Sequence, residues 1–146
     1  MGPIASERDP RITVDAMLQA VNEHQLEKLA ASFDADYVNE TPSHPERSFR
    51  GNAQVKKNWA QIFASIPDVT ARVVSSVVDG ERAWVELEMS GSKIDGASFL
   101  MRGVVIFAVG EDVIRSARFY LEPVEETSGD VDAAVNRVIR SSDRDT

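Results

Sequence analysis

Apolar residues recur at helical spacing in three segments of the first half of the chain, residues 13–21, 26–33 and 52–66. Thr13 is expected to cap the first helix and Asn52 the third, because both side chains can accept a hydrogen bond from a free backbone N–H. The sequence therefore predicts three amphipathic helices. Their apolar faces consist of Ala16, Met17, Ala20 and Val21, then Leu26, Leu29, Ala30 and Phe33, then Val55, Trp59, Ile62, Phe63 and Ile66.

Alternation of apolar and polar residues replaces helical spacing in the second half of the chain. Asp79-Gly80 is typical of a tight hairpin turn, and the later connections are also short, so the strands are expected to be antiparallel neighbours in chain order. A shorter strand over residues 36–41 precedes the third helix. Helices followed by strands indicate an α+β fold. The four main strands are predicted over residues 69–78, 82–89, 97–109 and 113–123.

The two ends of the chain differ from the folded domain, which is predicted over residues 13–124. Residues 1–12 are expected to form a flexible N-terminal arm. Residues 125–146 are predicted to contain a polar hinge, a short helix capped by Asp130 and a disordered tail from residue 141. The helix is expected to dock on the domain or on a partner subunit, because four aliphatic residues share one face: Val131, Val135, Val138 and Ile139.

Composition excludes several classes of protein. The 146 residues are 42% hydrophobic and 27% charged, which suits one globular domain, and no apolar run is long enough to span a membrane. The chain has no cysteine and only two histidines, so no metal site and no cofactor is expected. A net charge of −8 argues against binding to nucleic acid. Since no apolar stretch near the N-terminus resembles a signal peptide, the expected location is cytoplasmic.

The last predicted strand carries a row of polar side chains. Arg118, Tyr120 and Glu122 alternate with Phe119 and Leu121, so the two sets lie on opposite faces of the strand. We expect the polar set to face the interior of the domain and the apolar set to pack outward, against a helix or a partner. A carboxylate beside an arginine and a phenol can act as an acid or a base. A solvated sheet face, or a row of cross-strand pairs, has the same pattern.

Six short segments stand out by their order and spacing: Phe33–Asn39, Arg50-Gly51, Trp59–Phe63, Pro67-Asp68, Asp79-Gly80 and Ile114–Glu122. Together they resemble the SnoaL-like branch of the nuclear-transport-factor-2-like superfamily, over roughly residues 13–124. The resemblance implies a cone-shaped α+β barrel, in which a curved antiparallel sheet wraps around N-terminal helices. It also implies an apolar pocket between sheet and helices, and commonly a homodimer. Ketosteroid isomerases, polyketide cyclases, limonene epoxide hydrolases and proteins without catalytic activity share this fold, so the fold does not identify a function.

The resemblance to the isomerases fails at the residues that would react. Their general base is an Asp directly before a Pro, and here Thr41 precedes Pro42. Their oxyanion-hole positions fall near Met17 and Val104, whose side chains have no hydrogen to donate to an enolate oxygen. Isomerase activity is therefore not expected.

The resemblance to the epoxide hydrolases is closer. Arg118, Tyr120 and Glu122 match the positions of an Arg, a Tyr and an Asp on the final strand of those enzymes. Those enzymes also have an Arg-x-Asp on a central strand. The nearest equivalents here are two carboxylates, Glu86 and Glu88, and Arg102 one strand further on is the candidate for the missing arginine. The resemblance therefore implies an incomplete set of catalytic residues.

Two functions remain open. In the first, the protein binds or converts a small apolar or cyclic molecule without a cofactor. Glu122 would then be the acid or base, Arg118 and Tyr120 would orient it, and His44 or Glu88 would carry the second proton. In the second, the protein is a non-catalytic ligand-binding or interaction module, and the polar row is a structural network. A homodimer through the outer sheet face is expected, and the predicted pocket-lining residues are Asn39, Trp59, Glu88 and Arg102.

Overall fold

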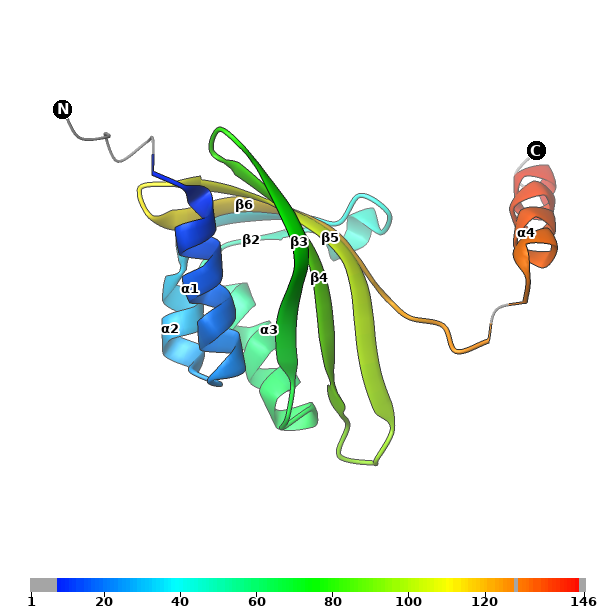
Figure 1. Ribbon diagram of the computed structural model, residues 1–146, viewed down its shortest axis with the longest axis horizontal. Helices are drawn as coiled ribbons and strands as arrows, with labels where there is room; N and C mark the ends of the chain where they lie inside the picture. Colours follow the sequence, from blue (N-terminus) through cyan, green and yellow to red (C-terminus); the bar gives the residue numbers. More distant parts are fainter. Residues whose placement is uncertain (1–7, 128, 145–146) are drawn as a thin grey trace.

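The computed structural model describes residues 8–127 and 129–144 (Figure 1). Three helices and two short strands come first, four long strands follow, and a further helix ends the described chain. None of the described helices is long and apolar enough to cross a membrane. In chain order the elements are α1 (Pro10–Asn22), α2 (Leu26–Ala31), β1 (Phe33–Glu40), the 3₁₀ turn η2 (Pro45–Arg47), β2 (Phe49–Arg50), α3 (Asn52–Ser65), β3 (Thr70–Asp79), β4 (Arg82–Ser92), β5 (Ser98–Gly110), β6 (Val113–Pro123) and α4 (Val131–Arg144).

All six strands form one curved sheet in the order β2-β1-β6-β5-β4-β3. The predicted order of the four long strands is confirmed, because β3, β4, β5 and β6 are consecutive antiparallel neighbours. The sheet is nevertheless mixed rather than wholly antiparallel, since β1 pairs with β6 in parallel. Alternating residues specify which face of a strand is buried, but they do not specify which strand lies beside it. The predicted α+β class and the curved sheet are confirmed.

The core lies between the concave face of the sheet and helices α1 to α3 (Figure 1). Every second side chain of β4 points into it, so Val85 is fully buried, as is Val105 opposite it on β5. Val14 on α1 and Leu29 on α2 are also fully buried. The side chains that alternate with these buried ones along β4 and β5 point to the outer face of the sheet. The curved sheet therefore has an apolar inner face covered by helices and an outer face that none of the described helices covers (Figure 1).

The first helix begins three residues before the predicted cap at Thr13. Asp9 is the cap, because its Oδ1 accepts a hydrogen bond of 2.9 Å from the backbone N of Arg11. Pro10 suits the first turn, where no backbone N–H is required. Thr13 lies within the helix and is buried. The structured domain thus extends into the segment predicted as an arm, of which residues 1–7 lie outside the described residues.

The helix α4 forms as predicted, extends further than predicted, and lies away from the domain in this structure. Asp130 caps it, with Oδ1 accepting a hydrogen bond of 3.0 Å from the backbone N of Ala133. Its helical backbone continues through residues 141–144, which were predicted as disordered tail, and residues 145–146 lie outside the described residues. Figure 1 shows α4 standing away from the rest of the molecule at the end of an extended segment. Its four aliphatic side chains, Val131, Val135, Val138 and Ile139, are between 50% and 73% exposed.

Candidate functional site

A cavity of about 350 Å³ lies between the concave face of the sheet and α3. Strands β1, β5 and β6 form one side of it, and the middle of α3 forms the other. Most of the side chains that border it are apolar or aromatic. They are Phe33, Tyr37, Asn39, Thr41, Arg47, Phe49, Val55, Asn58, Trp59, Ile62, Met89, Phe99, Met101, Phe119 and Leu121.

The orientation predicted for the last strand is wrong. Phe119 and Leu121 border the cavity, whereas Tyr120 between them lies on the outer face and is 40% exposed. Phe119 is in register with Val105, which is fully buried, and side chains in register across a sheet point to the same face. By strand alternation Glu122 also lies on the outer face. The more apolar face of β6 faces the core, whereas the sequence-based prediction places the polar row on the core side.

Three polar side chains on and after β1 form a chain of hydrogen bonds along the cavity wall. The hydroxyl of Tyr37 donates to Oδ1 of Asn39 at 2.8 Å, and Nδ2 of Asn39 donates to Oγ1 of Thr41 at 3.4 Å. Tyr37 and Asn39 are buried, and burial raises the pKa of the Tyr37 phenol. The phenol therefore stays protonated near neutral pH and orients the Asn39 amide nitrogen toward Thr41. Oγ1 of Thr41, at the outer end of this chain, accepts from Asn39 and keeps its own hydrogen to donate.

Arg47 is the one charged residue among the described residues that border the cavity. None of these residues is an Asp, a Glu or a His. Arginine keeps its proton in proteins, and the raised pKa of Tyr37 makes that phenol a poor base. The cavity wall therefore offers donors and a positive charge, but no group that exchanges a proton near neutral pH.

The residues predicted as catalytic come together only in part, and outside the cavity. Nε2 of His44 lies 2.8 Å from Oε1 of Glu122, with the Glu122 side chain 43% exposed. On the same outer face, Nε of Arg118 lies 3.4 Å from Oε2 of Glu40. Tyr120 is not among the described residues that line the cavity. The structure thus pairs His44 with Glu122 and separates both from the apolar pocket.

The four residues predicted to line a pocket are divided between the two faces of the sheet. Asn39 and Trp59 border the cavity. Glu88 and Arg102 face outward, where Nε of Arg102 donates to Oε2 of Glu88 at 2.8 Å and Arg72 lies 3.4 Å from Oε1. The hydrogen bond from Arg102 lowers the pKa of Glu88. Glu88 and Arg102 therefore belong to a network of ion pairs on the outer face.

Several cavity residues were not predicted. Tyr37 and Thr41 share a strand face with Asn39, so strand alternation alone could have placed them together. Arg47 lies in the turn η2, and Asn58 lies beside Trp59 on α3. No periodic pattern marks either residue, because the direction of each side chain depends on how the turn or helix packs against the sheet.

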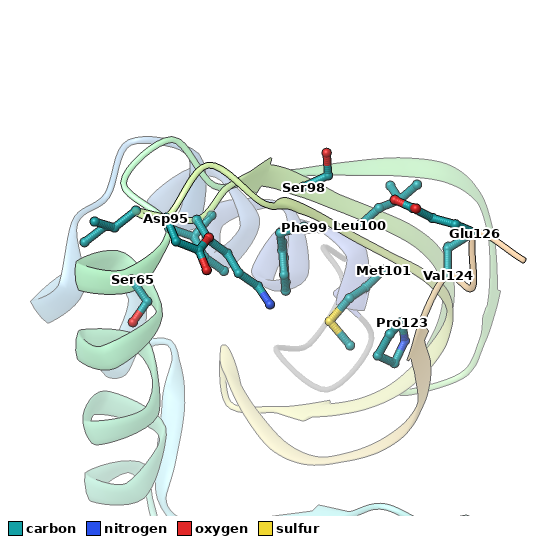
Figure 2. Close-up of a pocket in the computed structure, with 12 residues that line it drawn as sticks. Ser65, Asp95, Ser98, Phe99, Leu100, Met101, Pro123, Val124 and Glu126 are labelled. Carbon is teal, nitrogen blue, oxygen red and sulfur yellow. The ribbon is translucent and has the colours of Figure 1, made fainter.

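A second, larger depression lies beside the cavity and is called the groove below. It has a volume of about 770 Å³ and lies between the end of α3, the β4–β5 loop and the end of β6. Figure 2 shows Phe99 and Met101 pointing into the hollow between β5 and α3, whereas Ser98 points away from it. Phe99 and Met101 border both the groove and the cavity. The groove is lined by Ser65, Ile66, Lys93, Ile94, Asp95, Ser98, Phe99, Leu100, Met101, Pro123, Val124 and Glu126.

Comparisons with known proteins agree with this architecture. A family model described as SnoaL-like domain matches residues 14–117, more than two thirds of the chain. A search of curated protein sequences gives no match.

Solved structures with a similar fold include an LEH-like epoxide hydrolase from M. tuberculosis, at 16% identity and a TM-score of 0.67, covering 77% of this chain and 82% of that one. A putative SnoaL-like polyketide cyclase from Shewanella denitrificans has 9% identity and a TM-score of 0.66, covering 77% and 90%. A hypothetical protein with a ketosteroid isomerase-like fold from Catenulispora acidiphila, in complex with trimethylamine, has 18% identity and a TM-score of 0.64, covering 74% and 84%. At these identities the similarity shows a common fold and not a common reaction.

Proposed function

Since this chain belongs to the SnoaL-like domain family, we propose that its cavity binds a small, largely apolar molecule that has one oxygen-bearing end. The observation that carries the proposal is the lining of the cavity, which is apolar except for a few hydrogen-bond donors and one arginine. A volume of about 350 Å³ suits a small cyclic molecule. The polar end of the ligand would be a carbonyl or a carboxylate, because Thr41, Asn39 and Arg47 all present donors to it.

Binding without acid–base chemistry is the function that the lining favours. Epoxide hydrolysis and ketosteroid isomerisation both need a carboxylate at the reacting atom. The described residues that border the cavity include no carboxylate and no imidazole, and burial keeps the Tyr37 phenol protonated. The acid–base hypothesis would instead require the pair of His44 and Glu122 to act on a molecule bound at the outer face.

We also propose that the outer face of the sheet is covered by a second copy of this chain. Val77 is 67% exposed and Trp84 is 45% exposed, and these two residues are directly opposite each other on β3 and β4. Tyr120 on β6 is 40% exposed on the same face, and the strand between them contributes buried Ile106, opposite Trp84, and partly buried Val104, opposite Tyr120. Exposed apolar side chains in adjacent rows are typical of an interface between subunits.

The two tryptophans provide a test of the cavity, because Trp59 borders it and Trp84 lies on the outer face. The variant Trp84→Phe keeps only the cavity tryptophan, and Trp59→Phe keeps only the outer one. We expect cyclohexanecarboxylate to change the fluorescence of Trp84→Phe with a saturable dependence on concentration. The matched variant Trp59→Phe should show no such change.

A second comparison tests the polar end of the ligand. Cyclohexanol has the same ring as cyclohexanecarboxylate but lacks its charge. In Trp84→Phe we expect the carboxylate to bind at least about tenfold more tightly than the alcohol, because Arg47 contributes a charge-assisted hydrogen bond. Adding Arg47→Gln should remove that preference. A response of Trp84 rather than Trp59, or no saturable response to either compound, would overturn the proposed site.

A further inference from the structure

The helix α4 has an aliphatic stripe made of Val131, Val135, Val138 and Ile139, all at least half exposed. A helix of 14 residues is only marginally stable in water without packing along its apolar face. Arg140 lies on the side of α4 away from the stripe, so the stripe is the face that burial would stabilise. These features indicate that the stripe docks on an apolar surface.

The groove is such a surface, and it lies where the segment leading to α4 leaves the domain. Phe99 and Met101 point into it, and Ile94 on its rim is 76% exposed. Figure 2 shows Val124 and Glu126, which belong to the segment leading to α4, along its wall. The groove is therefore continuous with the start of that segment.

The connecting segment is long enough for α4 to fold back. Val124 is part of the groove wall, and seven residues along the chain lead from it to Val131. A fully extended chain of that length spans up to about 24 Å, so the segment leaves room for α4 to turn back toward the groove. Gly129 next to the helix has a φ of +82°, a conformation that glycine adopts without strain, so it is suited to act as the hinge.

We infer that α4 folds back onto its own domain and seats the aliphatic stripe in the groove. The same chain is favoured over a second copy because a short tether holds α4 at an effective concentration in the millimolar range, far above that of another molecule at micromolar protein.

Docking of α4 would cover one side of the ligand cavity. Phe99 and Met101 border both the groove and the cavity, so a helix in the groove lies directly over the two side chains that separate them. Ligand exchange through this side then requires α4 to leave. The docking itself does not depend on the proposed function, whereas this effect on ligand exchange rests on it.

Engineered cysteine pairs test the docking, because the chain has no cysteine of its own. Val135→Cys on the stripe is combined with Ile94→Cys on the groove rim in the full chain. Ala133→Cys with Ile94→Cys is the matched control, since residue 133 is on the opposite side of α4 from the stripe. Under mild oxidation at micromolar protein, we expect the first pair to form an intramolecular disulfide at least about tenfold faster than the control. Equal rates, or cross-links mainly between chains with a rate that rises with protein concentration, would overturn the inference.

The exchange of a bound probe tests the consequence. Val135→Asp combined with Ile139→Asp places two charges on the stripe without altering any described residue of the cavity or the groove. We expect 1-anilinonaphthalene-8-sulfonate to dissociate from this variant at least about threefold faster than from the unaltered chain. An unchanged dissociation rate would refute the gating role of α4. If the probe binds to neither protein, the proposed cavity function fails, while the cysteine pairs still decide whether α4 docks.

Discussion

Removing the hydroxyl of Tyr37 tests the polar chain on which the proposed binding mode depends. In Tyr37→Phe, Oδ1 of buried Asn39 loses the donor that now lies 2.8 Å away. Leaving a buried carbonyl oxygen without a partner costs about 1–3 kcal/mol. With about 2 kcal/mol as the central value, the melting temperature of a chain of this size should fall by about 4–8 °C. Thermal unfolding followed by circular dichroism measures this shift.

The same variant should change how stability depends on alkaline pH. Burial raises the pKa of Tyr37 in the folded protein, whereas in the unfolded chain the phenol has its ordinary pKa of about 10. The contribution of the buried, protonated phenol to the free energy of unfolding is fully present below that ordinary pKa. As the pH rises above it, the unfolded chain loses the proton and the folded protein keeps it. The free energy of unfolding then falls by up to about 1.4 kcal/mol per pH unit. Tyr37→Phe should lack this contribution.

Tyr120→Phe is the matched control, because it makes the same change at the chain's other tyrosine, on the outer face of β6. Its side chain is 40% exposed and has no buried acceptor like that of Tyr37. We expect it to retain the melting temperature within about 2 °C, since it keeps the aromatic ring that the proposed dimer would cover and breaks no buried hydrogen bond; such changes alter stability by about 0.5 kcal/mol or less. Urea unfolding at a series of pH values from neutral to alkaline gives the free energies for all three proteins. If Tyr37→Phe is as stable as the unaltered chain, or loses stability equally at high pH, the buried hydrogen bond does not have the role described here.

Three further changes address the cavity, the polar row and the dimer. Leu121→Trp should fill the cavity and weaken cyclohexanecarboxylate binding at least about tenfold by calorimetry, and undiminished affinity would place the ligand elsewhere. Glu122→Gln should change the free energy of urea unfolding by about 0.5 kcal/mol or less and leave that affinity unaltered, since its partner His44 is also partly exposed; a larger effect would restore a role for this pair. Trp84→Lys should convert a dimer into a 16.1 kDa monomer in light scattering, and a monomer before the substitution would refute the dimer.

Much of the fold was predictable because each main element has a local signal. Helical spacing indicated α1, α2 and α3, and the turn at Asp79-Gly80 with short later connections indicated the order of β3 to β6. The parallel pairing of β1 with β6 was not predictable, since it joins segments separated by most of the chain. Phe33 was assigned to a helix and instead begins β1, because a single aromatic residue fits either pattern at the boundary.

The candidate site was less predictable because it depends on which strand face is turned inward. Alternation correctly divided the side chains of β6 between two faces of the strand. The wrong prediction concerned which of these faces is turned toward the helices. Phe119 and Leu121 gain more from burial than Glu122 would, since a carboxylate loses hydration that only a strong partner restores. His44, half-exposed in an irregular turn, is the partner that the structure provides, and it keeps Glu122 at the surface.

The polar row is better explained by the outer face than by catalysis. Glu88 pairs with Arg72 and Arg102, and Glu122 pairs with His44, all on the side of the sheet away from the cavity. Partly exposed pairs of this kind add little to the stability of a monomer. In the proposed dimer they would lose water together, and a mismatched register would leave charges unpaired at a cost of several kcal/mol. In the proposed dimer, charged rows between apolar rows would therefore allow two copies to meet in one register only, and this role would require no reaction at Glu122.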